Sequence, residues 1–343
     1  MRLYDINTVK KLIYKKNMLA RAVSRLGIAL PQPINILVYI TLNCGNDCEG
    51  CFQKTDEFYR NRLSSMASDD YRFILASLKK AYPLKPNIHL FGGEPLLHPQ
   101  FSEFLSISRE LGYRPSITIN MRYIDEKNID LLGSSSISQL NISINSYAGG
   151  EIRDIYGKLI GHVRRLKERY NKAVSVVYYL SPSNHRSFSE VVMHLSDNLD
   201  KNTISTFLCQ HFLFDNRAEA IEKNKGMDIE CVKEQTRALR RRRLNFNLMF
   251  LPNLPMDMFE RYYKSEETFM SECYIPWLGL AVYPDLNVTM GGGMLWCNNI
   301  VGSLRDKTWS QIWHGDKLKY YRNMLMHGRL PEECFRCCHK VYC

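Results

Sequence analysis

The sequence predicts an α/β fold: a partial (β/α)6 barrel of parallel strands, followed by a small cysteine-rich C-terminal domain. Two observations lead to this prediction. Strand-like and helix-like segments alternate from residue 34 to about residue 215, and six of the eleven cysteines lie within residues 269–343. Alternating strands and helices are typical of a parallel sheet covered by helices. The 343 residues, 45% of them hydrophobic, suffice for a large domain and a smaller one.

The predicted elements of the core follow one another regularly. The expected strands are 34–42, 87–91, 116–121, 140–145, 174–180 and 203–212, and the expected helices are 69–81, 101–111, 126–132, 152–169 and 188–199. The strand segments are rich in Val, Ile and Tyr, which favour pleated structure. Active sites on parallel sheets lie at the carboxyl ends of strands. Polar residues and cysteines directly after the strands are therefore the candidates for function.

Three segments lie outside this core of residues 34–215. Residues 1–33 include a basic amphipathic helix, which we expect to pack on its own domain rather than on a membrane. Residues 216–268 form a linker with a possible extra strand over 244–251, and residues 269–343 form the C-terminal domain. The chain has no secretory signal and no run of about 18 apolar residues. It is therefore expected to be cytoplasmic, without a membrane span, and to hold its cysteines reduced for metal chemistry.

Three cysteines directly follow the first predicted strand. Cys44, Cys48 and Cys51 have C-x3-C-x2-C spacing, so their thiolates can surround one face of a four-iron cluster. Three protein ligands leave the fourth iron open to bind another molecule. A structural zinc site would need a fourth ligand, and none lies nearby in the sequence. The spacing therefore indicates an open, reactive iron–sulfur site.

This loop resembles the cluster motif of the radical S-adenosylmethionine superfamily, and the resemblance extends over residues 35–215. In that family the open iron chelates the amino and carboxylate groups of S-adenosylmethionine, and one electron cleaves the sulfonium to give a 5′-deoxyadenosyl radical. The family usually has an aromatic residue just before the third cysteine. This chain has Gly50 there and Phe52 after the cysteine, which leaves the adenine pocket undefined in detail.

The end of the second strand carries a further family motif. Gly92, Gly93 and Glu94 resemble the family's GGEP sequence, in which the backbone and the acid bind the amino group of the cofactor. Glycines permit close approach of the backbone to a ligand. The alternative is a simple glycine turn before a helix, but the position of this motif after the three-cysteine loop favours the cofactor-binding interpretation.

Polar residues at the ends of the third and fourth strands complete the predicted cofactor site. Asn120 resembles an asparagine that the family has at this position. Ser143 and Asn145 match positions that often contact the cofactor ribose, although the family commonly has Asp where this chain has Asn145. The resemblance thus implies a cofactor contact from each of these strand ends.

A second group of cysteines lies in the C-terminal domain. A distant pair of cysteines, here Cys273 and Cys297, joined to a C-x2-C pair, here Cys334 and Cys337, is typical of a four-cysteine site for zinc or iron–sulfur. Residues 270–343 resemble the auxiliary-cluster domain called SPASM, or its shortened form, twitch, which implies one auxiliary [4Fe-4S] cluster. The expected ligands are Cys273, Cys297, Cys334 and Cys337, with Cys343 as an alternative ligand and Cys338 as a spare thiol.

Two residues of the sixth strand are candidates for catalysis. Ser205, Phe207, Cys209 and His211 share one face of this strand. Cys209 could donate a hydrogen atom to a substrate radical, and His211 could accept a proton. The alternative, a buried small cysteine and a histidine with its hydrogen bonds satisfied, is favoured by the general behaviour of such residues.

The predicted function is that of a radical S-adenosylmethionine oxidoreductase, with redox-neutral rearrangement or epimerisation as variants. It would use S-adenosylmethionine and two [4Fe-4S] clusters, take electrons from a donor such as flavodoxin or ferredoxin, and abstract hydrogen from a small metabolite or a peptide. Peptide-modifying relatives commonly carry a leader-binding module before the core. Only a short segment precedes the core here, which shifts weight to a small metabolite and leaves a ribosomal peptide maturase as the alternative.

A zinc-ribbon nucleic-acid-binding protein is an alternative of another class. The formal net charge of +11 and the C-x2-C pair agree with it. It explains neither the open three-cysteine loop nor the GGEP-like segment. We therefore expect a solvated basic face and no nucleic-acid partner.

Overall fold

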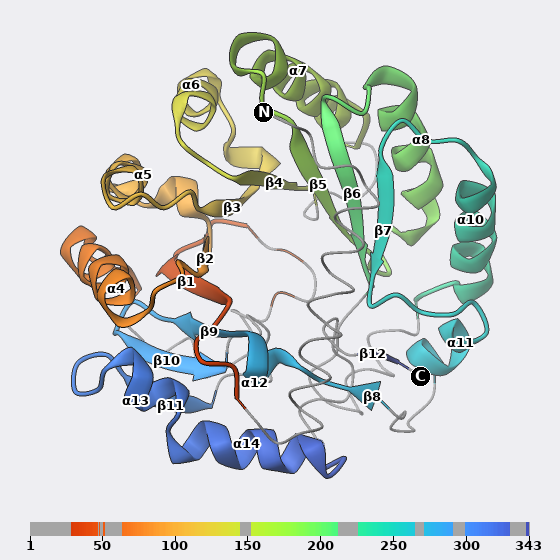
Figure 1. Cartoon of the computed structure of the whole chain (residues 1–343). Helices are drawn as coiled ribbons and strands as arrows, with labels where there is room; N and C mark the ends of the chain where they lie inside the picture. The colour runs from red at the N-terminus through yellow and green to blue at the C-terminus, as the bar shows by residue number, and fades with distance from the viewer. Residues whose placement is uncertain are drawn as a thin grey trace.

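Ten strands form one curved sheet, in the order β11-β10-β9-β1-β2-β3-β4-β5-β6-β7, with helices on its outer side (Figure 1). The computed structural model describes residues 29–46, 48, 51, 64–144, 152–211, 226–264, 271–290, 299–329 and 341–342. The predicted α/β fold with a parallel sheet is confirmed. The predicted helix near the N-terminus lies outside the described residues.

All six predicted core strands and the five helices between them are present, with ends shifted by at most two residues. The strands are β1 (Asn35–Thr41), β2 (Asn87–Gly92), β3 (Ser116–Asn120), β4 (Gln139–Ser143), β5 (Val174–Tyr179) and β6 (Ile204–Gln210). The helices are α4 (Ser68–Ala81), α5 (Phe101–Glu110), α6 (Glu126–Ser134), α7 (Ile152–Tyr170) and α8 (Phe188–Asn198). Each of these strands pairs in parallel with the next.

The sheet is wider than the predicted six-stranded barrel. Strand β7 (Asn247–Leu251) pairs in parallel with β6, and β9 (Gly279–Val282) pairs in parallel with β1. Two antiparallel strands, β10 (Asn287–Met290) and β11 (Ile300–Ser303), continue beyond β9. The sheet therefore crosses the predicted boundary at residue 269, because strands from the C-terminal part lie beside β1.

Shorter elements complete the described chain. They are α10 (Ile229–Arg241), α11 (Met258–Lys264), α12 (Ile275–Leu278), α13 (Trp309–Trp313), α14 (Asp316–Met326), and the two-stranded pair β8 (Ser271–Glu272) with β12 (Val341–Tyr342). In the ranges that the structure describes, no helix combines the length and the apolar character that crossing a membrane requires.

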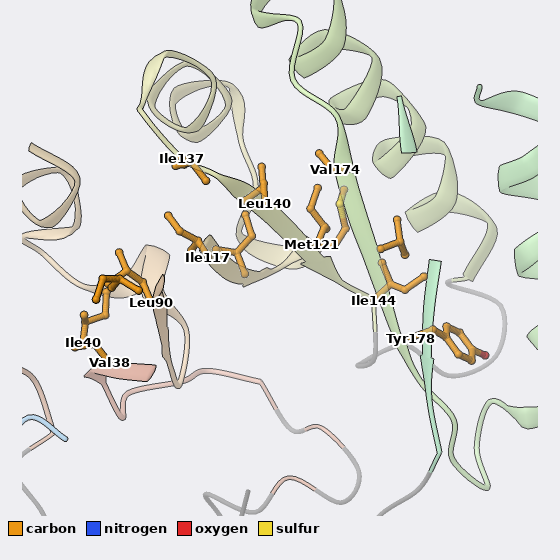
Figure 2. Close-up of a cluster of buried hydrophobic side chains, with 14 of the residues drawn as sticks. Val38, Ile40, Leu90, Ile117, Met121, Ile137, Leu140, Ile144, Val174 and Tyr178 are labelled. Atoms are coloured by element: carbon orange, nitrogen blue, oxygen red, sulfur yellow. The ribbon is translucent and has the colours of Figure 1, made fainter. Parts of the chain in front are cut away.

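Side chains alternate between the two faces of each strand. Val38, Ile40, Leu90, Ile117 and Leu140 are buried on the outer face, under the helices (Figure 2). Their neighbours in the sequence point to the concave inner face. This outer hydrophobic layer fixes the strands in place, so that residues at the strand ends and on the inner face are free to serve a site.

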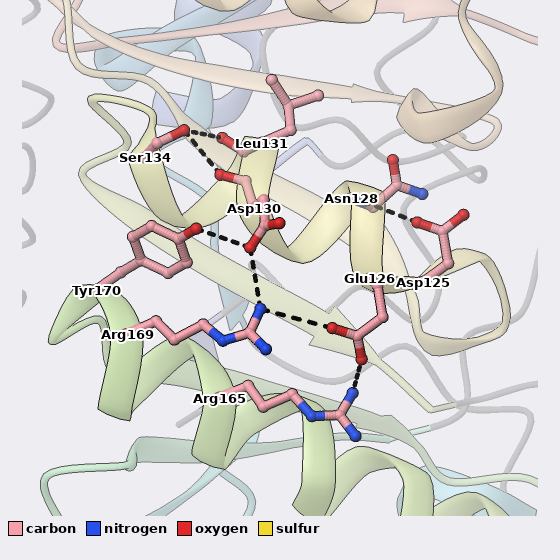
Figure 3. Close-up of polar contacts among 9 residues, drawn as sticks. All are labelled: Asp125, Glu126, Asn128, Asp130, Leu131, Ser134, Arg165, Arg169 and Tyr170. Atoms are coloured by element: carbon pink, nitrogen blue, oxygen red, sulfur yellow. Dashed lines mark hydrogen bonds and ion pairs between the residues drawn. The ribbon is translucent and has the colours of Figure 1, made fainter.

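A polar cluster joins the two helices beside β4. Arg165 and Arg169 of α7 form ion pairs with Glu126 of α6, and Arg169 also pairs with Asp130 (Figure 3). The hydroxyl of Tyr170 donates to Asp130 Oδ1 over 2.7 Å. Because these charged side chains are about half exposed, their pairs contribute little to the free energy of folding. They orient the helices more than they stabilise them.

Trp309 of α13 fastens the C-terminal part to the barrel. Its indole is buried, and Nε1 donates to Ser77 Oγ of α4 over 2.8 Å. We expect Trp309→Phe to lower the free energy of unfolding by about 1 kcal/mol through the lost hydrogen bond. Trp309→Ala should cost about 3–5 kcal/mol, because it also leaves a cavity. Urea unfolding of both variants measures this. The control is Tyr320→Ala on the exposed side of α14, and equal losses at both positions would contradict the anchoring role.

Candidate functional site

The first three cysteines lie where the sequence predicted, directly after β1 at the carboxyl edge of the sheet. Cys44 is exposed, Cys48 and Cys51 are half-buried, and the Cys51 amide donates to the Cys48 carbonyl over 3.2 Å. The segment 42–51 is called the cysteine loop here. Among the described residues, no three Cys, His, Asp or Glu side chains converge in a metal-binding group. The ligand assignment therefore depends on the spacing and on the thiol donors, which suit an iron–sulfur cluster.

Two glycines hold the start of the cysteine loop by backbone contact. Gly93 N–H donates to Thr41 O over 2.8 Å, and Glu94 N–H donates to Asn43 O over 2.9 Å. Gly92 has φ +148°, and a Cβ at Gly93 would lie 2.1 Å from Asn43 O. Only glycine permits this approach. The GGE segment is thus bonded directly to the backbone that leads into the cysteine loop.

Glu94 links the ends of β2 and β3. Its side chain is only 1% exposed, Oε2 accepts from the Asn120 N–H over 2.7 Å, and Oε1 accepts from the Leu96 N–H over 3.1 Å. Burial raises the pKa of this carboxyl to about 7, against the opposing effect of the two hydrogen bonds. The acid is therefore held in one orientation and changes its charge near neutral pH.

This raised pKa predicts a pH dependence of stability. Between about pH 4.5 and pH 7 the folded protein binds a proton on Glu94 that the unfolded chain has lost, so stability falls as the pH rises through this window and is then constant. Urea unfolding at pH 5 and pH 8 should show this fall for the wild type and a smaller one for Glu94→Gln. Gln is also expected to cost about 1–3 kcal/mol, because its NH2 group must face a backbone N–H. Identical pH profiles for the two proteins would contradict the assignment.

Asn120 and Ser143 lie side by side at the ends of β3 and β4, where they are register partners and are both buried. Asn120 Oδ1 accepts from the Arg122 N–H over 2.9 Å, which caps a short 3-10 turn after β3. Asn145 lies outside the described residues. The structure thus brings the ends of β2, β3 and β4 together, whereas cofactor contacts by these residues stay a prediction.

Tyr123 is a residue of this region that the sequence analysis did not identify. A Cβ at Gly45 would lie 2.7 Å from Tyr123 Oη, so the phenol rests against the cysteine loop. Burial and the neighbouring Cys44 thiol raise the pKa of Tyr123. Its position three residues after Asn120 was the available signal, since the turn after a strand end reaches the neighbouring loop.

Cys209 and His211 do share one face of β6, but it is the outer face. Both are fully buried, and His211 Nδ1 lies 2.6 Å from Tyr263 Oη among the rings of Phe250 and Phe259. Burial lowers the pKa of His211 to about 3 and raises that of Cys209. Their position in the aromatic core, away from the inner face, favours a structural role over a catalytic one. Only Nδ1 of the His211 ring is hydrogen-bonded, because Nε2 has no partner among the described residues.

Only one predicted ligand of the second group is described. Cys273 is half-buried and directly follows β8, which pairs with β12 through Ser271↔Tyr342 and Glu272↔Val341. The remaining predicted ligands, Cys297, Cys334, Cys337 and the alternative Cys343, lie outside the described residues, as does Cys338. The second site is therefore defined by its spacing and by one placed cysteine.

A buried cation lies near the segment that follows Cys273. Arg322 is 5% exposed, donates from Nε to Pro276 O and from Nη1 to Trp313 O, and stacks 4.4 Å from the Trp313 ring. Its Nη2 has no hydrogen-bond partner among the described residues, and burial lowers the pKa of Arg322 to about 10. A buried cation is costly without an anion. The environment thus suits a negatively charged group such as a cluster on thiolates.

Comparison with known proteins matches two family models to this chain. The radical SAM superfamily model matches residues 38–195, and the SPASM iron–sulfur cluster-binding domain model matches residues 273–338. The fold is similar to that of SuiB from Streptococcus suis bound to the precursor peptide SuiA, with a TM-score of 0.60 and 16% identity over 93% of this chain and 72% of SuiB. It is also similar to anSMEcpe with bound AdoMet, with a TM-score of 0.61 and 14% identity over 86% of this chain and 84% of that one.

A third solved structure has the same fold and holds a peptide. It is anSMEcpe with bound AdoMet and the Kp18Cys peptide, with a TM-score of 0.54 and 14% identity over 89% of this chain and 86% of that one. At these identities the likeness concerns the fold, and the residues of the site have to be argued from this chain.

Proposed function

Because the chain belongs to the radical SAM superfamily and carries a SPASM iron–sulfur cluster-binding domain, we propose that it is an oxidoreductase that starts its reaction by reductive cleavage of S-adenosylmethionine. The observation that carries this proposal is the bonding of the Gly92–Glu94 segment to the cysteine loop through Gly93 N–H···Thr41 O and Glu94 N–H···Asn43 O. This bonding supports the proposal because the segment with the three cysteines and the Gly92–Glu94 segment meet at adjacent strand ends.

Each part of the site has a proposed task. Cys44, Cys48 and Cys51 would hold a [4Fe-4S] cluster, which supplies the electron for cofactor cleavage when the site is loaded. The backbone at Gly93 permits close approach of the cofactor. Glu94 would offer an acceptor for its amino group, since each carboxylate oxygen uses one of its acceptor sites on a backbone N–H and retains another.

The C-terminal part would serve electron transfer. We assign a second [4Fe-4S] cluster to Cys273, Cys297, Cys334 and Cys337, with Cys343 as the alternative ligand. Its task would be to accept the electron that remains after hydrogen abstraction. A flavodoxin or ferredoxin would deliver the first electron. Arg322 is buried and its Nη2 has no partner within the described part of the chain, which supports an anionic group in this part of the molecule.

We propose a peptide substrate ahead of a small metabolite. SuiB was solved with a precursor peptide and anSMEcpe with a peptide, and both share the fold of this chain. This reverses the preference drawn from the short segment before the core. A ribosomal peptide maturase is thus the leading substrate proposal.

The test is anaerobic reconstitution of the full chain. Iron and sulfide analysis should give about eight irons per chain, for two four-iron clusters, and dithionite with S-adenosylmethionine should yield 5′-deoxyadenosine. About four irons plus one zinc would make the C-terminal site structural. Absence of 5′-deoxyadenosine from protein with a full iron content would reject the proposed function.

A further inference from the structure

The barrel wall carries no formal charge. The ten strands of the large sheet contain no Asp, Glu, Lys or Arg, although the whole protein has a net charge of +11. The single titratable side chain on the inner face of β2–β4 is His89. A group that contacts these described strands therefore meets side chains without formal charge.

The inner face has two layers directly below the carboxyl edge. Asn120 of β3 and Ser143 of β4 form a register pair in the upper layer, and Thr118 and Asn141 form the next pair on the same face. Two residues along a strand correspond to about 7 Å. The Thr118–Asn141 pair thus lies one layer beneath the predicted cofactor contacts.

A continuous chain of hydrogen bonds runs through this lower layer and across β2–β6. The members are His89 Nδ1···Ser116 Oγ at 2.6 Å, Thr118 Oγ1···His89 Nε2 at 3.1 Å, Asn141 Nδ2→Thr118 Oγ1 at 3.2 Å, Gln139 Nε2→Asn141 Oδ1 at 2.9 Å, Gln139 Nε2→Ser175 Oγ at 3.2 Å and Ser175 Oγ···Ser205 Oγ at 3.3 Å. It contains only neutral donors and acceptors.

The proton positions in this series of hydrogen bonds follow from the bonds at Ser116 and His89. Ser116 donates to Ile88 O, so its oxygen accepts from His89 Nδ1–H. Burial lowers the pKa of His89 to about 4, so the neutral ring must accept at Nε2, and Thr118 donates to it. His89 is thereby fixed as one neutral tautomer and orients the Thr118 hydroxyl.

Asn141 keeps unused hydrogen-bonding capacity. One N–H goes to Thr118 and the carbonyl oxygen accepts from Gln139, which leaves one N–H and one lone pair without a partner among the described residues. The side chain is half-buried. The free N–H of Asn141 can donate to the carbonyl of another amide, and its carbonyl oxygen can accept from the N–H of that amide.

The upper layer is apolar on the other side of the barrel. Ser143 pairs with Val177, Val177 pairs with Leu208, and Leu208 pairs with Met249. These three apolar side chains are half-buried on the inner face. A ligand in the upper layer would therefore have the Asn141 carboxamide below it and these apolar side chains beside it.

We propose that Asn141, with Thr118 and His89 behind it, is the substrate-recognition site, and that it binds an uncharged amide flanked by an apolar side chain. This inference rests on the proposed function, because it takes the group below the cofactor as substrate. A free carboxylate or phosphate at this depth would lose its hydration without meeting a cation on the strands. For a peptide substrate, the residue that enters the barrel is internal or amidated and carries no charge.

The test compares two probes on the reconstituted full chain with S-adenosylmethionine: perdeuterated N-acetyl-leucine methylamide and perdeuterated N-acetyl-leucine, which differ in a neutral amide against a carboxylate. Equilibrium dialysis should show at least about tenfold tighter binding of the methylamide. With dithionite, deuterium should appear in 5′-deoxyadenosine from the methylamide. Equal binding of the two probes, or no binding of the methylamide, would overturn the inference.

Two matched variants localise the effect. Asn141→Asp introduces a charge at nearly constant shape and should weaken methylamide binding by about tenfold or more. Asn247→Asp makes the same change on the inner face of β7, outside the hydrogen-bonded chain, and should not. Equal weakening of methylamide binding by the two variants would overturn the assignment of the recognition site to Asn141. Loss of 5′-deoxyadenosine in wild type with methylamide binding preserved would reject the proposed function and leave the recognition site standing.

Discussion

Replacing Cys51 with alanine is expected to abolish formation of 5′-deoxyadenosine, with a loss of at least about 1,000-fold. The proposed cluster has only three protein ligands, Cys44, Cys48 and Cys51, and no other described Cys, His, Asp or Glu joins them in a metal-binding group. Two thiolates cannot hold the cubane in the geometry that leaves one iron open. Anaerobic chromatography of the reaction with dithionite and S-adenosylmethionine measures the loss.

Cys231→Ala is the matched control for this variant. Cys231 is a half-buried cysteine on α10, where its sulfur accepts from Gln235 Nε2 over 3.1 Å, and it is not part of either motif. It should keep full iron content and cleavage, whereas Cys51→Ala should fall from about eight irons to about four. Undiminished cleavage in Cys51→Ala would refute the cluster assignment.

The second large effect is expected from Gly93→Ala. The new Cβ would lie 2.1 Å from Asn43 O and 2.8 Å from Leu42 O, both backbone atoms that no side-chain rotation can move away. The cysteine loop must shift or lose the hydrogen bonds at Gly93 and Glu94. Because a displacement of about 1 Å can cost 10²-fold in rate, cleavage of S-adenosylmethionine should fall by about 10²-fold or more. Overpacking should also lower the free energy of unfolding by about 1–3 kcal/mol.

Gly157→Ala provides the opposite expectation for the same substitution. Gly157 lies within α7, and a Cβ there would meet no atom within 4 Å. Alanine at this position should raise the free energy of unfolding by about 0.4–1 kcal/mol and leave cleavage unchanged. Gly93→Ala could instead behave like Gly157→Ala in both the free energy of unfolding and the cleavage of S-adenosylmethionine. The close backbone contact between the GGE segment and the cysteine loop would then not be required for function.

Most of the barrel could be predicted because its signals are local. Each core strand is a short apolar run bounded by a helix with its own periodicity. Strand β9 carries no such signal: its four residues, GLAV, are all buried, and its partner β1 lies far away in the sequence. Its place in the sheet is decided by a long-range pairing that no local pattern encodes.

Site residues that directly follow a strand could be predicted from the sequence, because the carboxyl ends of adjacent parallel strands lie together. The GGE segment and Asn120 meet through Glu94 because β2 and β3 are adjacent. The face on which Cys209 lies could not be predicted in the same way. Period-two alternation placed Ser205, Phe207, Cys209 and His211 on one face, but the irregular register at the start of β6 brings Ser205 to Ser175 on the inner face. Pairing with β5, not the pattern within β6, decides that Cys209 points to the helices.

The hydrogen-bonded chain on the inner face could not be predicted from the sequence, because it too depends on pairing between strands. His89, Thr118 and Asn141 come from three strands, and each is an ordinary polar residue in its own segment. Only the register Thr118↔Asn141, together with the side-chain bonds, makes them one unit.

The pairing of β9 with β1 limits which chimeras between this protein and its relatives can fold. Four register pairs, from Asn35↔Gly279 to Val38↔Val282, cover one edge of the strand that leads into the cysteine loop. A shortened chain that ended before β9 would expose the apolar segment NILVYIT as an unpaired edge, which is a template for aggregation. Chimeras that exchange the C-terminal part must therefore supply a strand of matching length and register. The barrel and the C-terminal part share one sheet and therefore do not behave as interchangeable modules.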